Sequence, residues 1–82
     1  MNPRVKSVVV LDDYILDLKF ENGEYGQFSM KPYLEYPVYK PLCDYNVFKQ
    51  AQVTMGFVSW NSGRIDMSPD NLYLDCKIAG RK

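Results

Sequence analysis

Apolar and polar residues alternate along the first quarter of the chain as expected of β-strands. Residues 5–11 are rich in β-branched side chains, and their far end, residues 8–11, is apolar on both faces. Residues 14–20 alternate more regularly, with one apolar side made of Leu16, Leu18 and Phe20. Asp12-Asp13 between the runs is typical of a turn. The pattern therefore predicts two strands joined by a turn.

A hairpin follows at residues 21–24, because Asn22-Gly23 supplies the positive φ angles of a tight turn. A two-residue loop would pair Leu16 with Ser29 and leave Phe28 facing solvent. A three-residue loop with Gly23 left-handed pairs Leu16 with Phe28, so that both face the core. A slip of one residue reverses every side chain, and we therefore predict the three-residue loop.

The middle of the chain is interrupted by Pro32, Pro37 and Pro41, which exclude a long helix or a central strand there. One helical turn is expected over residues 30–34, after Ser29. Asp44 is suited to cap a short helix from Tyr45 to Gln50 or Ala51.

The last third contains two further apolar runs with a period of two, residues 53–55 and 58–60. The apolar positions are odd-numbered before Gly56 and even-numbered after it. This change predicts a bulge or, as we favour, a very tight hairpin. Residues 64–67 are expected to form a short edge strand. Ser68-Pro69-Asp70 is a typical helix start, with Ser68 as the N-cap. The tail, residues 79–82, is expected to be frayed.

These elements predict one small α+β domain over residues 1–82, mostly antiparallel sheet with two or three short helices. The chain has no repeat, linker or low-complexity segment, and 46% of its residues are hydrophobic, enough to form a core. The side chains expected to share that core are Leu16, Leu18, Phe20, Phe28, Phe48, Val58 and Trp60.

The net charge and the N-terminal residues limit which partners and which cellular location are expected. Ten basic residues balance ten acidic ones, whereas a small nucleic-acid-binding domain carries a basic excess, so no direct nucleic-acid contact is expected. The N-terminus lacks the features of a signal peptide, and the longest apolar run, residues 8–11, is too short for a bilayer. We expect a cytoplasmic protein without membrane contact, in which Cys43 and Cys76 stay reduced.

Candidate chemistry is sparse. The chain contains no histidine, which removes the commonest general base and the commonest zinc ligand. Cys43 and Cys76 lie far apart without companion ligands, and no phosphate-binding glycine motif occurs, so neither metal nor cofactor is expected. The carboxylates of Asp12, Asp13 and Asp70 are explained by turns and a helix start. The sequence therefore predicts a protein that is not an enzyme.

The proline-fixed segment around residues 33–39 carries the most suggestive side chains, the tyrosines Tyr33, Tyr36 and Tyr39. Rigid aromatic rings on such a loop suit a partner-binding surface. The same rings could instead fold over the open sheet face as core. The second interpretation is favoured, because so small a chain has few other groups to cover its sheet.

A second candidate site is a shallow pocket formed by Trp60, Arg64, Asp66 and Tyr73. An arginine, an acid and aromatic rings could hold a carboxylate or phosphate. Alternatively, Arg64 and Asp66 form a surface ion pair beside a core tryptophan, which contributes little to stability.

Residues 60–73 combine a tryptophan, a turn, an aspartate and then Pro-Asp-Asn-Leu-Tyr. Upstream lie Pro3-Arg4-Val5, the hairpin residues 16–24, Leu42 and Phe48. In this order and at these spacings they resemble a small bacterial family of domains of unknown function, the one numbered 2442, over nearly the whole chain. The resemblance implies a compact α+β domain, no established activity and no catalytic residues. It also implies a link to toxin–antitoxin-like gene pairs for some members and a helix-turn-helix domain in some longer ones, which would begin about where this chain ends.

Two functions remain as hypotheses. The first is a non-catalytic protein-interaction module, antitoxin-like or regulatory, that binds a small partner protein or forms a homodimer. Its interface would be an edge strand, residues 5–11 or 64–67, helped by Tyr36 and Tyr39. The alternative is a small-ligand-binding domain or minor enzyme that uses the pocket near Trp60, Arg64 and Asp66.

Overall fold

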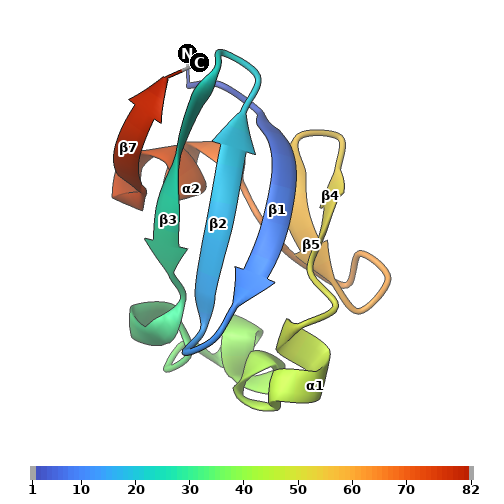
Figure 1. Ribbon diagram of the computed structural model, residues 1–82. Coiled ribbons are helices and arrows are strands. Elements are labelled where there is room, and N and C mark those ends of the chain that lie inside the picture. The colour runs from blue at the N-terminus through green and yellow to red at the C-terminus, as the bar shows by residue number, and fades with distance from the viewer. Residues whose placement is uncertain (1, 82) are drawn as a thin grey trace.

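The computed structural model describes residues 2–81, which form two antiparallel sheets and four short helices (Figure 1). The larger sheet has the strand order β1-β2-β3-β7, and the smaller has the order β4-β5-β6. The strands are β1 (Val5–Leu11), β2 (Ile15–Phe20), β3 (Glu24–Ser29), β4 (Gln52–Thr54), β5 (Phe57–Trp60), β6 (Ile65–Met67) and β7 (Lys77–Arg81). The α+β fold class is confirmed.

The helices are short because prolines and caps bound them. They are the 3-10 helices η1 (Lys31–Tyr33) and η2 (Pro37–Cys43) and the α-helices α1 (Tyr45–Phe48) and α2 (Pro69–Asp75). Asp44 caps α1 by accepting the amide of Asn46, and Ser68 caps α2 by accepting the amide of Asn71. Both caps were predicted. Helix α1, however, ends at Phe48, two to three residues earlier than expected.

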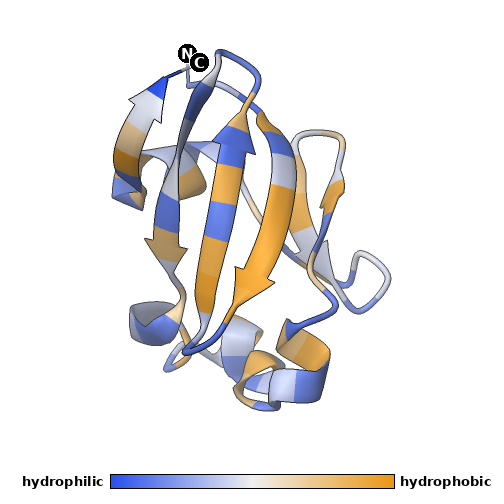
Figure 2. Cartoon of the chain, viewed as in Figure 1, coloured by the Kyte–Doolittle hydropathy of each residue, from blue (hydrophilic) through white to orange (hydrophobic). Residues whose placement is uncertain are grey.

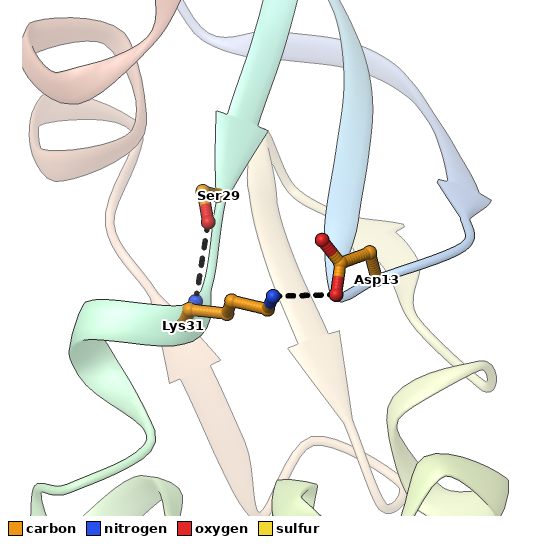
Figure 3. A network of polar contacts seen from close by, with 3 residues as sticks. All are labelled: Asp13, Ser29 and Lys31. Carbon is orange, nitrogen blue, oxygen red and sulfur yellow. Dashed lines mark hydrogen bonds and ion pairs between the residues drawn. The ribbon is translucent and has the colours of Figure 1, made fainter.

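The loop between β1 and β2 is tied to η1 by polar contacts. The Lys31 ammonium lies 2.5 Å from a carboxylate oxygen of Asp13, and the Lys31 amide donates to the Ser29 hydroxyl at 3.4 Å (Figure 3). Both charged side chains are more than half exposed, so the ion pair itself adds little stability. The pair marks where the β1–β2 loop lies beside the start of η1, at the lower end of the larger sheet.

Both predicted hairpins are formed, and the first has the predicted register. Leu16 pairs with Phe28, and Gly23 has φ 91°, as the three-residue loop requires. In the second hairpin Val53 pairs with Val58, and Met55 and Gly56 both have positive φ. Two positive φ angles in a two-residue loop are typical of the tight turn that matches strand twist. The tight hairpin at Gly56 is therefore confirmed, and the bulge is not formed.

The core lies between the inner face of the larger sheet and the smaller sheet with α2 (Figure 1). All seven side chains predicted to share it are buried, with at most 1% of their surface exposed. Figure 2 shows the underlying pattern, with β1 apolar along most of its length and β2 alternating. The core also contains side chains that the pattern did not single out: Val5, Met30, Leu42, Ile65, Met67 and Leu72.

The C-terminal tail differs from the expectation. Residues 79–81 are not frayed but belong to β7, in which Gly80 pairs with Tyr25 and Arg81 with Glu24 of β3. The prediction was wrong because the pairing depends on backbone positions on a strand more than fifty residues away in the sequence. Lys82, also part of the predicted tail, lies outside the described residues.

Candidate functional site

The two faces of the larger sheet have different surroundings. Its inner face packs on the core, as shown by the edge contact between Phe20 and Tyr73 of α2, with ring centroids 5.2 Å apart. Its outer face carries Ile15, Asp17 and Gln27, and no helix formed by residues 2–81 lies across it (Figure 1). The outer face is therefore left uncovered by the helices of residues 2–81.

A groove of about 480 Å³ opens at the lower end of this face. One side is formed by the outward residues Ile15, Gln27 and Ser29 of β2 and β3. The opposite side comes from η1, the segment after it and the junction of α2 with β7: Pro32, Tyr33, Tyr36, Asp75 and Lys77. The groove thus brings residues 75–77 next to residues 15 and 27–36, which lie about forty or more positions earlier in the sequence.

Tyr33 is a fixed wall of the groove. Its ring stacks on the core ring of Phe28 at 5.5 Å, and its hydroxyl donates to the carboxylate of Asp75. Tyr36 meets Tyr33 edge to face, with centroids 5.9 Å apart, yet 54% of its surface is exposed. The predicted partner-binding tyrosines therefore divide: Tyr33 is half-buried, and Tyr36 presents its ring to solvent.

Tyr39 serves the fold more than the groove, since it is absent from the groove lining. It packs against the core, and its hydroxyl donates to the backbone carbonyl of Asp66 at 3.3 Å. Burial, with a smaller contribution from the Asp66 carboxylate, raises the pKa of Tyr39. The structure thus packs Tyr33 and Tyr39 against the core, as the favoured interpretation expects, and leaves Tyr36 exposed.

A second hollow, of about 510 Å³, adjoins the groove on β3 and β7 and shares Gln27 and Lys77 with it. Its lining includes Asp17, Tyr25 and Ala79. The two hollows therefore lie next to each other on the outer surface of β3 and β7.

The four residues of the alternative ligand site are not brought together. Trp60 is fully buried, and its indole N–H donates to the Phe48 carbonyl oxygen at 3.0 Å. Tyr73 instead donates to Glu24 at 2.6 Å. Asp66 lines a separate hollow of about 330 Å³ whose lining lacks Trp60, Arg64 and Tyr73.

Arg64 and Asp66 are both exposed, and the predicted surface ion pair between them is not formed within residues 2–81. The arrangement around Trp60 is therefore a packed core beside a solvated turn. Nothing in it places the arginine, the acid and the aromatic rings around one space.

The surroundings of Cys76, Glu24 and Tyr73 shift their pKa values. Burial, together with the nearby carboxylates of Asp17 and Glu24, raises the pKa of the Cys76 thiol to about 11. The hydrogen bond from Tyr73 is the main cause of a lowered pKa of Glu24 and of a raised pKa of Tyr73. Within residues 2–81 no group of three or more acidic, cysteine or histidine side chains is arranged to hold a metal ion.

Sequence reasoning gave a binding role to only two of the eight groove residues, Tyr33 and Tyr36. The other six had been given none: Ile15, Gln27, Ser29, Pro32, Asp75 and Lys77. Outward-facing positions on β2 and β3 were a usable signal for Ile15 and Gln27, since strand parity places them opposite the core residues. No local signal marks Asp75 and Lys77, because their position depends on the pairing of β7.

Comparison with known families gives one match. The model of the family described as "Protein of unknown function (DUF2442)" matches residues 5–77. No curated protein and no solved structure matches the chain. None of the helices formed by residues 2–81 is long and apolar enough to cross a membrane.

Proposed function

We propose that this chain, which belongs to the DUF2442 family, is a non-catalytic domain that binds a small partner protein in the groove beside Tyr33 and Tyr36. The observation that carries the proposal is the exposed ring of Tyr36 at the rim of a groove that opens onto an uncovered sheet face. The proposal includes a regulatory, antitoxin-like role in the cytoplasm, where the partner would be found.

The composition of the groove supports a protein partner. Two aromatic rings and Ile15 offer apolar contact area, while Gln27 and Ser29 offer hydrogen bonds along one side. Such a mixture of aromatic anchors and polar groups is typical of protein interfaces. Tyr33 is held by Phe28 and Asp75, so its ring is already placed and loses little entropy on binding.

The chemistry of the groove favours binding over catalysis. Its one carboxylate, Asp75, already accepts a hydrogen bond from Tyr33. Its one cation, Lys77, is exposed, as expected of a side chain that pairs with a partner's acidic group. The alternative of a ligand site around Trp60 has no comparable support, since that side chain is fully buried.

The test is site-specific crosslinking. A photoreactive phenylalanine analogue is placed at Tyr36 or, as a control, at Met55, which is 83% exposed on the distant β4–β5 hairpin. In cells of the native host we expect one protein to be crosslinked from position 36 and not from position 55. Equal products from both positions, or none from position 36, would contradict the proposal.

A variant then tests the same contact with the purified partner. Tyr36→Ser should weaken binding by roughly ten- to a hundred-fold, the usual effect of truncating an interface tyrosine. Val38→Ser is the matched control, because Val38 is 57% exposed on the same segment but does not line the groove. An equal loss with both variants would place the contact outside the groove.

A further inference from the structure

The hollow of about 330 Å³ lies on the outer face of the smaller sheet. Strand pairing puts Ser59 of β5 opposite Asp66 of β6, on the face turned away from Trp60. The rest of its lining comes from the β4–β5 hairpin, the β5–β6 loop and the segment before β1: Arg4, Thr54, Met55, Phe57 and Gly63. This volume is at the small end of the roughly 300–1,000 Å³ range of small-molecule sites. The hollow therefore suits a ligand of few atoms.

Arg4 is held in place by its backbone and stem, while its charged end has no partner. Its carbonyl accepts the Glu21 amide at 2.9 Å, and the next amide, of Val5, donates to the Gly56 carbonyl at 3.0 Å. The side-chain carbons pack on Gly56, where an added Cβ would lie 2.8–2.9 Å from three of them. The guanidinium forms no hydrogen bond or ion pair with another of residues 2–81. The fold thus positions this cation and leaves its donors available.

The Asp66 carboxylate supplies the opposite charge. The backbone carbonyl of Asp66 accepts the Tyr39 hydroxyl at 3.3 Å, whereas its side chain forms no hydrogen bond or ion pair within the described part of the chain. Arg4 and Asp66 therefore line one hollow without forming an ion pair with each other. Two opposite charges that share a space in this way suit a ligand that carries both charges.

A pair of hydroxyl groups adds a further donor. The hydroxyl oxygens of Thr54 and Ser59 are 2.9 Å apart and share one hydrogen bond. Each hydroxyl has one hydrogen, so the pair always keeps one O–H that is not donated within it. Ser59 is the only buried polar side chain of residues 2–81, and a buried hydroxyl donates inside the protein, so the spare hydrogen belongs to the exposed Thr54. Together with Arg4, Thr54 can donate to a carboxylate in the hollow.

The same hollow has an apolar rim, formed by Met55 and Phe57. Both side chains are among the exposed large hydrophobic residues, at 83% and 38% of their surface. A flexible thioether and an aromatic ring adapt well to an apolar group placed between them. The rim therefore offers contacts to the uncharged part of a ligand.

We infer that this hollow binds a free α-amino acid with an apolar side chain. The carboxylate of the ligand accepts hydrogen bonds from Arg4 and Thr54, and its ammonium group donates to Asp66. Its side chain packs against the apolar rim. A simple anion would be repelled by Asp66, a simple cation would be repelled by Arg4, and the interior of a peptide carries neither charge. The hollow shares no residue with the groove of the proposed function, so the two conclusions can fail separately.

Ligands that lack one group at a time test the inference on the wild-type protein. Titration of ¹⁵N-labelled protein with L-leucine should shift the amide signals of residues 54–66 to saturation, with a roughly millimolar Kd. N-acetyl-L-leucine lacks the ammonium group, L-leucinamide lacks the carboxylate, and glycine lacks the side chain, so each should bind about ten-fold more weakly. Absence of saturable shifts with leucine, methionine and phenylalanine would overturn the inference. Equal binding of leucine and either charge-deleted analogue would also overturn it.

Two variants then assign the charges. Arg4→Met keeps the stem that packs on Gly56, and it should weaken the binding of leucine about ten-fold but not that of leucinamide. Asp66→Asn should weaken the binding of leucine about ten-fold but not that of N-acetyl-leucine. Arg64→Met is the matched control, because Arg64 is exposed and does not line the hollow. Circular dichroism confirms that each variant is folded, and an equal loss with Arg64→Met and Arg4→Met would contradict the assignment.

Discussion

Gly26 of β3 lies so close to the backbone of β7 that a Cβ atom on it would be 2.2 Å from the carbonyl oxygen of Lys77. Real Cβ atoms do not approach a carbonyl oxygen so closely, and the obstacle is backbone, which cannot rotate away as a side chain could. Glycine at position 26 is therefore what allows the C-terminal strand to join the larger sheet, and with it the groove wall at Lys77.

We predict that Gly26→Ala displaces β7 from β3 and destabilises the domain by about 1–3 kcal/mol, as overpacking does. Hydrogen exchange should show faster exchange of the amides of residues 77–81, with little change in β1 and β2. Gln27→Ala is the control, because Gln27 is exposed on the neighbouring position of the same strand. Unchanged protection of β7 in the Gly26 variant would show that the sheet yields at little cost.

Trp60 should be the most sensitive core position. Truncation to Ala should cost about 3–5 kcal/mol, as for other large aromatic side chains in cores. Trp60→Phe keeps most of the volume but leaves the Phe48 carbonyl without its indole donor, so a loss of about 1–3 kcal/mol is expected. Denaturant unfolding followed by circular dichroism measures both variants.

Trp60 is also the single tryptophan of the chain, so the fluorescence of the native protein reports on it alone. Its emission should be blue-shifted, because the side chain is fully buried. Emission typical of a water-exposed indole would contradict the burial and return Trp60 to the surface.

The hydrogen bond between Tyr73 and Glu24 predicts a dependence of stability on pH at both extremes. The pKa of Glu24 is lowered from 4.5, chiefly by the hydrogen bond from Tyr73, so its contribution is present above 4.5 and is lost as the pH falls further. The pKa of Tyr73 is raised from 10.0, chiefly by the same bond, so its contribution is present below 10.0 and is lost as the pH rises further.

Thermal unfolding from pH 3 to pH 11 measures this dependence in wild type, Glu24→Gln and Tyr73→Phe. The difference in stability between wild type and Glu24→Gln should shrink at acidic pH. The difference between wild type and Tyr73→Phe should shrink above pH 10.0. Differences that stay constant across the whole range would show that the bond does not couple the two groups.

The two cysteines should differ in reactivity. With a pKa of about 11, only about one Cys76 thiol in a thousand is ionised at pH 8, and the side chain is half-buried. Cys43 is exposed and should react with iodoacetamide much faster. Intact mass measured over time should show one rapid addition and one slow one, and two rapid additions in guanidinium chloride. Two equally rapid additions to native protein would contradict the protection of Cys76.

Much of the fold could be predicted because the signals are local. Asn22-Gly23 and Gly56 set the hairpin turns. Of the two possible registers of the first hairpin, only one turns Phe28 towards the core, and this decides between them. Asp44 and Ser68 predicted helix starts, because their side chains can accept hydrogen bonds from backbone amides two and three residues away. In each case the residues that decide the structure are neighbours in the sequence.

The groove could be predicted only in part. Tyr33 and Tyr36 were singled out because a proline-fixed aromatic loop suggests a surface, but whether each ring packs or protrudes depends on Phe28 and on the end of α2. The proposed ligand site fails for a similar reason, although Trp60, Arg64 and Asp66 lie close in the sequence. In the hairpin of β5 and β6 the indole is buried in the core, whereas the two charged side chains are exposed to solvent.

By itself the sequence determined the periodicity, turns and caps of this protein, and through them the fold class and the main core. Only the tertiary structure decided that residues 77–81 form a strand, and that Lys77 and Asp75 meet Tyr33 in one groove. The physical reason is that pairing β7 with β3 depends on backbone groups and on the missing side chain of Gly26, neither of which leaves a pattern in the residues of β7.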